Sequence, residues 1–139
     1  MIYFDASVLV PLLVADTHTR RASAWYSTLS ASVIVSDLAS LEVSAVLSRD
    51  LRTGRLTLSA AESALLDFDA MRASCERLSH GAPDFVLAER MVRDFSTKLA
   101  AADALHLASV KNASATLATF DARLAEAAKA KGVEVAELG

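Results

Sequence analysis

Four acidic side chains in this sequence have the types and positions that metal-dependent chemistry requires. They are Asp5, Glu42, Asp103 and Asp121. Asp5 and Asp121 each directly follow a short apolar run of the kind that forms a β-strand. Glu42 falls on or beside the apolar face of a predicted helix, and Asp103 interrupts an almost wholly apolar helical segment, so exposure to solvent does not account for either charge.

Four carboxylates brought close together would repel one another strongly. Each close pair costs on the order of 4 kcal/mol at an effective dielectric constant near 20. The carboxylates therefore either lie apart or hold a cation. Because the chain has one cysteine, Cys75, and no pair of histidines at ligand spacing, an all-oxygen site would favour Mg²⁺ or Mn²⁺ over zinc.

Short runs of β-branched and aromatic residues predict the strands that would carry these acids. The predicted strands are Ile2–Phe4, Val33–Val35, Cys75–Leu78, Ala115–Phe120 and Val133–Val135. Helical spacing of apolar residues predicts helices after Ser7, from about Thr17 to Leu29, and over Leu38–Asp50, Ala60–Ser74, Asp84–Phe95, Lys98–Ala108 and Ala122–Lys131. Strand and helix alternate, which predicts an α/β fold of three layers, with a central, mostly parallel sheet and helices on both faces.

Capping residues mark several of the predicted helix ends. Ser7 and Ser36 are predicted N-caps, and Ser59–Glu62 has the pattern of a capping box. Gly132 is predicted at the C′ position of the last helix. In open α/β sheets, ligands bind at the carboxyl ends of the strands, so Asp5 is expected at the binding edge.

Size and composition predict one domain over residues 1–139, because 53% of the residues are hydrophobic and only two are proline. The lone cysteine, the lack of a basic leader and the lack of a long apolar run lead us to expect a cytoplasmic protein without a membrane anchor. The net charge of −3 is uninformative about nucleic acid, because setting four carboxylates aside as metal ligands would make the balance slightly positive.

Three motifs and one helical acid, in this order, resemble a known family. They are Asp5-Ala6-Ser7 after the first strand, Glu42, the segment Leu99–Ala108 around Asp103, and Thr119-Phe120-Asp121. Together they are similar to PIN domains, and most of all to the VapC-type ribonuclease toxins of bacterial toxin–antitoxin pairs. The resemblance covers essentially the entire chain, and the run from Asp103 to Ala108 is its most specific part.

The resemblance implies a Mg²⁺-dependent endoribonuclease, with Mn²⁺ as the alternative metal, that cuts RNA and is inhibited by a cognate antitoxin. Asp5 and Asp103 would be the principal metal ligands, and Glu42 and Asp121 would complete the acidic pocket. Toxins of this type generally form homodimers. The sequence departs from the family pattern before Asp103, where Lys98 and Ala100 occupy a stretch that often contains an arginine.

Two other functions are open from the sequence alone. Asp5 could be phosphorylated in a phosphotransfer protein, although no second acid lies beside it and the last strand ends in Asp121 where such proteins have a lysine. Alternatively, the acidic pocket could be inactive and the protein a binding module that uses Trp25, Tyr26 and Leu29.

Several neighbours of the four acids have two readings. His106 is interpreted as a packed core histidine rather than a catalytic base. Ser7 and Thr119, each two residues from a proposed ligand, could hold those carboxylates by hydrogen bonds or cap the following turns.

Overall fold

The computed structural model describes residues 1–139 as four parallel strands connected by helices. The strands are β1 (Ile2–Phe4), β2 (Val33–Ser36), β3 (Glu76–Leu78) and β4 (Thr116–Ala118). The helices are α1 (Ala6–Leu13), α2 (Thr19–Ser27), α3 (Asp37–Arg52), α4 (Leu58–Ala73), α5 (Ala82–Arg93), α6 (Ala101–Asn112) and α7 (Ala122–Ala130), with a 3₁₀ turn at Phe95–Thr97. The strand order is β3-β2-β1-β4, which confirms the predicted α/β class with a parallel sheet.

The central strands are in register, and their side chains alternate between two faces of the sheet. Tyr3 on β1 pairs with Ile34 on β2 and with Leu117 on β4, and all three belong to one buried cluster. Phe4, the next residue, belongs to a second cluster on the opposite face. Because both faces are covered there, β1 is apolar at every position and β2 is apolar up to Ser36, as buried parallel strands are.

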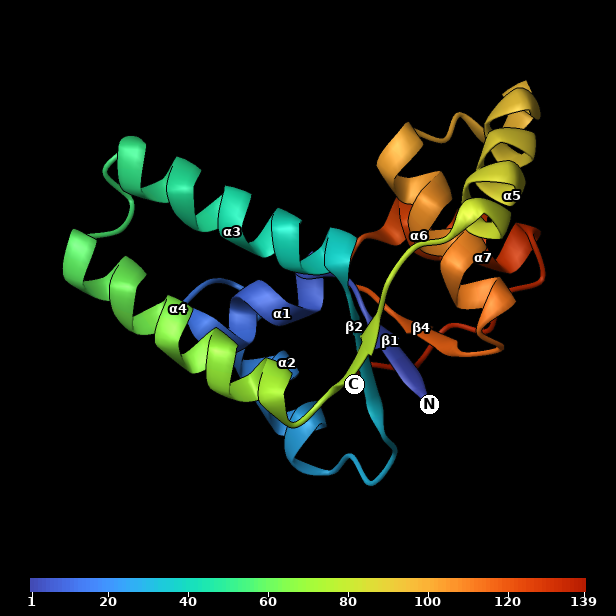
Figure 1. Cartoon of the computed structure of the whole chain (residues 1–139). Coiled ribbons are helices and arrows are strands. Elements are labelled where there is room, and N and C mark those ends of the chain that lie inside the picture. The colour runs from blue at the N-terminus through green and yellow to red at the C-terminus, as the bar shows by residue number, and fades with distance from the viewer.

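Each face of the sheet has its own set of helices, as Figure 1 shows. Residues of α1, α3 and α4 pack with Phe4 in one cluster, and α2 adds Trp25 and Tyr26 at its border. Residues of α5, α6 and α7 pack with Tyr3 in the other. Helices α3 and α4 run side by side away from the sheet. The resulting three layers place the carboxyl ends of β1, β2 and β4 at one edge.

Two predicted helix caps are wrong, and the structure gives the physical reason. The N-cap of α1 is Asp5, whose side chain accepts the backbone N–H of Val8, while Ser7 lies within the helix. Helix α4 is capped by Thr57, whose hydroxyl accepts the N–H of Ala60, so the predicted capping box at Ser59–Glu62 does not form. In both cases a neighbouring oxygen acceptor takes the role that the sequence pattern gave to a serine.

The predicted bounds also differ around the last two strands. Helix α6 begins at Ala101 because Lys98 has a left-handed backbone, with φ of 52°, which ends the 3₁₀ turn before it. The predicted strand Val133–Val135 is reduced to one bridge between Leu117 and Val135. Gly132 follows α7 with φ of 72°, as its predicted C′ role requires.

None of the helices combines the length and apolar character needed to cross a lipid bilayer.

Phe68 tests the second cluster, because its side chain is 1% exposed on α4. We expect Phe68→Ala to lower the free energy of unfolding by about 3–5 kcal/mol, since it removes buried apolar surface and leaves a cavity. Leu66→Ala on the same helix is the control: Leu66 is 71% exposed, so the change should stay within about 0.5 kcal/mol. Urea unfolding measures both, and equal losses would contradict the assignment of this face to the core.

Candidate functional site: an acidic edge of the sheet

Asp5 is a buried carboxylate with hydrogen-bond donors on both of its oxygens. It lies directly after β1 and is 5% exposed. Its Oδ1 accepts the hydroxyl of Ser7 at 2.6 Å and the N–H of Val8 at 3.3 Å, and its Oδ2 accepts the hydroxyl of Thr119 at 2.6 Å. Burial raises the pKa of Asp5, and these hydrogen bonds partly oppose the shift. The carboxylate is thus fixed in orientation although it is costly to ionise.

The two hydroxyls that bind Asp5 also fix the turn after β4. Ser7 Oγ accepts the N–H of Phe120 at 2.8 Å, and Thr119 Oγ1 accepts the N–H of Asp121 at 3.0 Å. Each hydroxyl therefore donates to Asp5 and accepts a backbone N–H of the turn. This agrees with the prediction that Ser7 and Thr119 could hold carboxylates by hydrogen bonds. This arrangement brings Asp121 to the same edge of the sheet as Asp5.

Asp121 is the N-cap of α7. Its Oδ1 accepts the N–H of Arg123 at 2.9 Å and the N–H of Leu124 at 3.2 Å. Asp121 therefore has a structural role as a helix cap. Capping engages only Oδ1 of Asp121, which leaves Oδ2 available to another partner.

Asp103 lies in the first turn of α6 and shares a small cavity with Asp121. This cavity has a volume of about 130 Å³ and is also lined by Lys98 and Arg123. Burial raises the pKa of Asp103, and the nearby charges of Asp121 and Glu42 raise it further. Asp103 is therefore close enough to Asp121 and to Glu42 to be repelled by each of them, and two cationic side chains also line the cavity.

Glu42 reaches this edge from α3, where its side chain is 34% exposed. Its Oε1 is hydrogen-bonded to His106 Nε2, from one turn further along α6 than Asp103. His106 is 2% exposed, as expected for a core histidine, yet both of its ring nitrogens make polar contacts. The sequence pointed to His106 only as a packing residue, although its spacing of three residues from Asp103 puts both on one side of the helix.

A divalent metal site at this edge would need several oxygen ligands within reach of one ion. No three histidine, cysteine, aspartate or glutamate side chains lie close enough to enclose a metal ion between them. Mg²⁺ is commonly bound by one or two carboxylates, with water and substrate phosphate completing its octahedron. The oxygen ligands offered by Asp5 and Asp103 therefore fit Mg²⁺ in chemical type, whereas a preformed four-carboxylate cluster stays a prediction.

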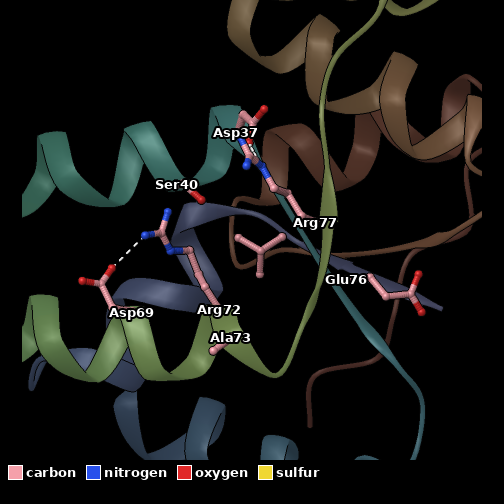
Figure 2. A pocket seen from close by; sticks show the side chains of 8 residues that line it. Asp37, Ser40, Asp69, Arg72, Ala73, Glu76 and Arg77 are labelled. Carbon is pink, nitrogen blue, oxygen red and sulfur yellow. Dashed lines mark hydrogen bonds and ion pairs between the residues drawn. The ribbon is translucent and has the colours of Figure 1, made fainter.

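A different pocket, shown in Figure 2, contains none of these four acids. It has a volume of about 380 Å³ and lies beside β3, between α3 and α4. Four of its five charged side chains are paired, because Arg77 bonds Asp37 at 2.7 Å and Arg72 bonds Asp69 at 2.7 Å, and Glu76 is the fifth. The bond to Arg77 lowers the pKa of Asp37. This pocket is a surface network of ion pairs rather than a gathering of like charges.

Comparison with known proteins decides the family. The PIN domain family profile matches residues 2–130. The chain belongs to the PIN domain family. Ribonuclease VapC45 of Mycobacterium tuberculosis is 34% identical over 139 residues, which cover 98% of this chain and 94% of that protein. The predicted resemblance to VapC-type PIN domains is thereby confirmed.

Solved structures show the same PIN fold. The crystal structure of VapC20 from Mycobacterium tuberculosis, a Sarcin-Ricin loop cleaving toxin, has a TM-score of 0.74 and 21% sequence identity, covering 91% of this chain and 95% of that one. VapBC2 of Rickettsia felis, solved bound to a DNA fragment from their promoter, has a TM-score of 0.73 and 14% identity, covering 98% of both chains. At these identities the likeness concerns the fold.

If Asp5 binds a divalent metal in this PIN domain, Mg²⁺ should stabilise the fold by an amount set by its concentration relative to its dissociation constant. We expect a rise in Tm with Mg²⁺ that disappears in Asp5→Asn. The rise should also shrink as pH falls, beginning above the ordinary carboxyl pKa of about 3.9, because burial raises the pKa of Asp5 and protons compete with the metal.

Asp69→Asn is the matched control for this thermal measurement, since Asp69 forms an exposed ion pair on α4. It should keep the full response to Mg²⁺. Loss of the response in both variants, or in neither, would contradict a metal role for Asp5.

Proposed function

We propose that the protein is a metal-dependent endoribonuclease toxin that hydrolyses RNA phosphodiester bonds and is inhibited by a cognate antitoxin. The observation that carries the proposal is the buried, hydroxyl-braced Asp5, at the same sheet edge as three further carboxylates. A stability role alone does not explain this arrangement, because burial raises the pKa of Asp5 and of Asp103 and so makes a fold with both groups ionised harder to form. The names of the curated relatives support RNA as the substrate.

In the proposed site, Asp5 and Asp103 bind Mg²⁺, with Mn²⁺ as the alternative. The metal supplies water of lowered pKa and neutralises charge that develops on the phosphate. Glu42 and Asp121 orient the attacking water. Lys98 and Arg123, which line the cavity with Asp103 and Asp121, offer positive charge to the RNA backbone beside the acids. An RNA-cutting toxin of this kind would act in the cytoplasm.

Purified protein incubated with RNA tests this function. We expect cleavage with Mg²⁺, loss of cleavage with EDTA, and a loss of about 100-fold or more in Asp5→Asn and in Asp103→Asn, because a direct ligand should matter at least as much as a residue that supports one. Asp69→Asn serves as the control and should cleave normally. Equal activity in all samples would reject the nuclease.

An antitoxin is the proposed protein partner. Its support is the resemblance to VapC-type toxins, together with the VapBC and FitAB structures among the fold neighbours. A short neighbouring reading frame that encodes a DNA-binding domain would identify a candidate antitoxin. Adding that protein to the RNA cleavage assay should suppress cleavage.

A second copy of the chain is the other proposed protein partner, and the surface between α3, α5 and α6 supports it. This surface surrounds an apolar hollow of about 550 Å³ lined by Leu38, Phe85, Val92 and Leu105, among others. Phe85 is 57% exposed and Val92 is 36% exposed, and both line the hollow. Exposed apolar groups gathered in this way are typical of protein interfaces.

A charge placed in this hollow should separate the proposed dimer. We expect Phe85→Glu to give a monomer by light scattering, whereas Leu66→Glu, at an exposed apolar position on α4, should leave the mass of the wild type unchanged. A monomeric wild type, or a dimer that survives Phe85→Glu, would rule out this interface.

A further inference from the structure

A continuous chain of hydrogen bonds runs through the core of the protein and ends at Glu42. It begins at the start of α3, where the N–H of Ala39 donates to Ser36 Oγ at 3.0 Å. Ser36 Oγ lies 2.6 Å from the hydroxyl of Tyr3, which lies 2.6 Å from His106 Nδ1. His106 Nε2 completes the chain at Glu42. Ser36 and Tyr3 are fully buried and His106 nearly so, so water cannot replace these bonds.

Counting hydrogens fixes the direction of this chain. A carboxylate can only accept, so His106 Nε2 carries a hydrogen and donates it to Glu42. In a neutral ring Nδ1 then has no hydrogen and accepts from the hydroxyl of Tyr3. The hydroxyl of Ser36 in turn donates to the oxygen of Tyr3. Every hydrogen is used, and every bond points towards Glu42.

The reverse direction leaves a buried donor unpaired. If Nδ1 donated to Tyr3, the hydroxyl of Tyr3 would have to donate to Ser36, which already accepts from Ala39. The side chain of Ser36 makes no other hydrogen bond. The hydrogen of its hydroxyl would therefore have no acceptor, although the residue is fully buried. Such an unpaired buried group costs about 1–3 kcal/mol. The same objection applies to a doubly protonated ring and to a protonated Glu42 that donates to Nε2, because both place a hydrogen on Nδ1.

We propose that Tyr3 and His106 are positioning residues for Glu42: Tyr3 fixes the ring of His106 in the Nε2–H tautomer, and His106 fixes the carboxylate of Glu42 at the acidic edge. This inference rests on the proposed nuclease function. Histidine tautomers are set in this way when the second ring nitrogen has a defined partner. Neither Tyr3 nor His106 contacts substrate, and both act through Glu42.

The alternative is that Tyr3 and His106 only fill the core, where their rings meet edge to face with centroids 5.7 Å apart. If the two rings only filled the core, the rate of RNA cleavage would not depend on the hydroxyl of Tyr3. Removing only that oxygen therefore separates the two roles.

Tyr3→Phe removes the hydroxyl and keeps the ring. We expect kcat for RNA cleavage to fall by about 10- to 100-fold with little change in KM. Tyr26→Phe is the matched control, because the other tyrosine of the chain packs its ring against Phe4 on the opposite face, and it should cleave normally.

A double-variant measurement shows whether the effect passes through Glu42. In a Glu42→Ala background, Tyr3→Phe should cause no further loss of the remaining activity. An equal further loss there would mean that Tyr3 supports the fold in general and would overturn the inference. Full activity of Tyr3→Phe in the wild-type background would overturn it too, while leaving the nuclease function intact. A wild type unable to cut RNA would reject both.

Nitrogen-15 NMR of the histidine rings in the wild type gives a test that needs no variant to fold. We expect His106 to have a hydrogen on Nε2 and none on Nδ1. His80 provides an internal reference of the opposite tautomer, since its Nε2 accepts the N–H of Leu38 and its Nδ1 donates to Ser109. Burial also lowers the pKa of His80, which keeps it neutral. Hydrogen on Nδ1 of His106 would overturn the inference.

Discussion

The structure depends on a carboxylate that is buried at the end of its central strand. Asp5 loses nearly all contact with water, and the fold compensates with two hydroxyls and a backbone N–H. Those hydroxyls come from different parts of the chain: Ser7 follows β1, and Thr119 follows β4. The hydrogen bonds to this one carboxylate therefore connect the turn after β1 with the turn after β4. They also place Asp121 at the carboxyl edge of the sheet. A buried polar group has become the organising point of a site.

The other two acids of the proposed site, Glu42 and Asp103, are positioned by helices rather than by loops. Asp5 is braced by short loops, whereas Glu42 and Asp103 project from two long helices that pack on different faces of the sheet. His106 bridges these helices, since it belongs to α6 and bonds Glu42 on α3. The distance between the two helices is thus controlled by a polar contact at the edge of the sheet as well as by apolar packing.

The sequence was sufficient to predict the parallel sheet and the strand end or helix that carries each of the four acids, whereas their joint action in one site stays a prediction. Strand residues such as Tyr3 and Phe4 are apolar in succession, and an acid after a strand has few positions available in this fold class. Helix caps were harder, because Thr57 and Ser59 both satisfy a capping pattern and only packing of the whole helix selects between them. The link from His106 to Glu42 spans 64 residues, and it depends on side-chain rotamers and helix placement that no local pattern contains.

The alternation along β1 has a consequence for how the sheet assembles. Strands of three or four residues contain little information with which to reject a neighbour displaced by one position. Here the phenol of Tyr3 supplies that information. A shift by one residue would turn it into the apolar layer that surrounds Phe4, where no imidazole accepts its hydrogen and no serine donates to its oxygen, at a cost of a few kcal/mol. A single oxygen atom thus helps the folding chain to distinguish one side of its thin sheet from the other.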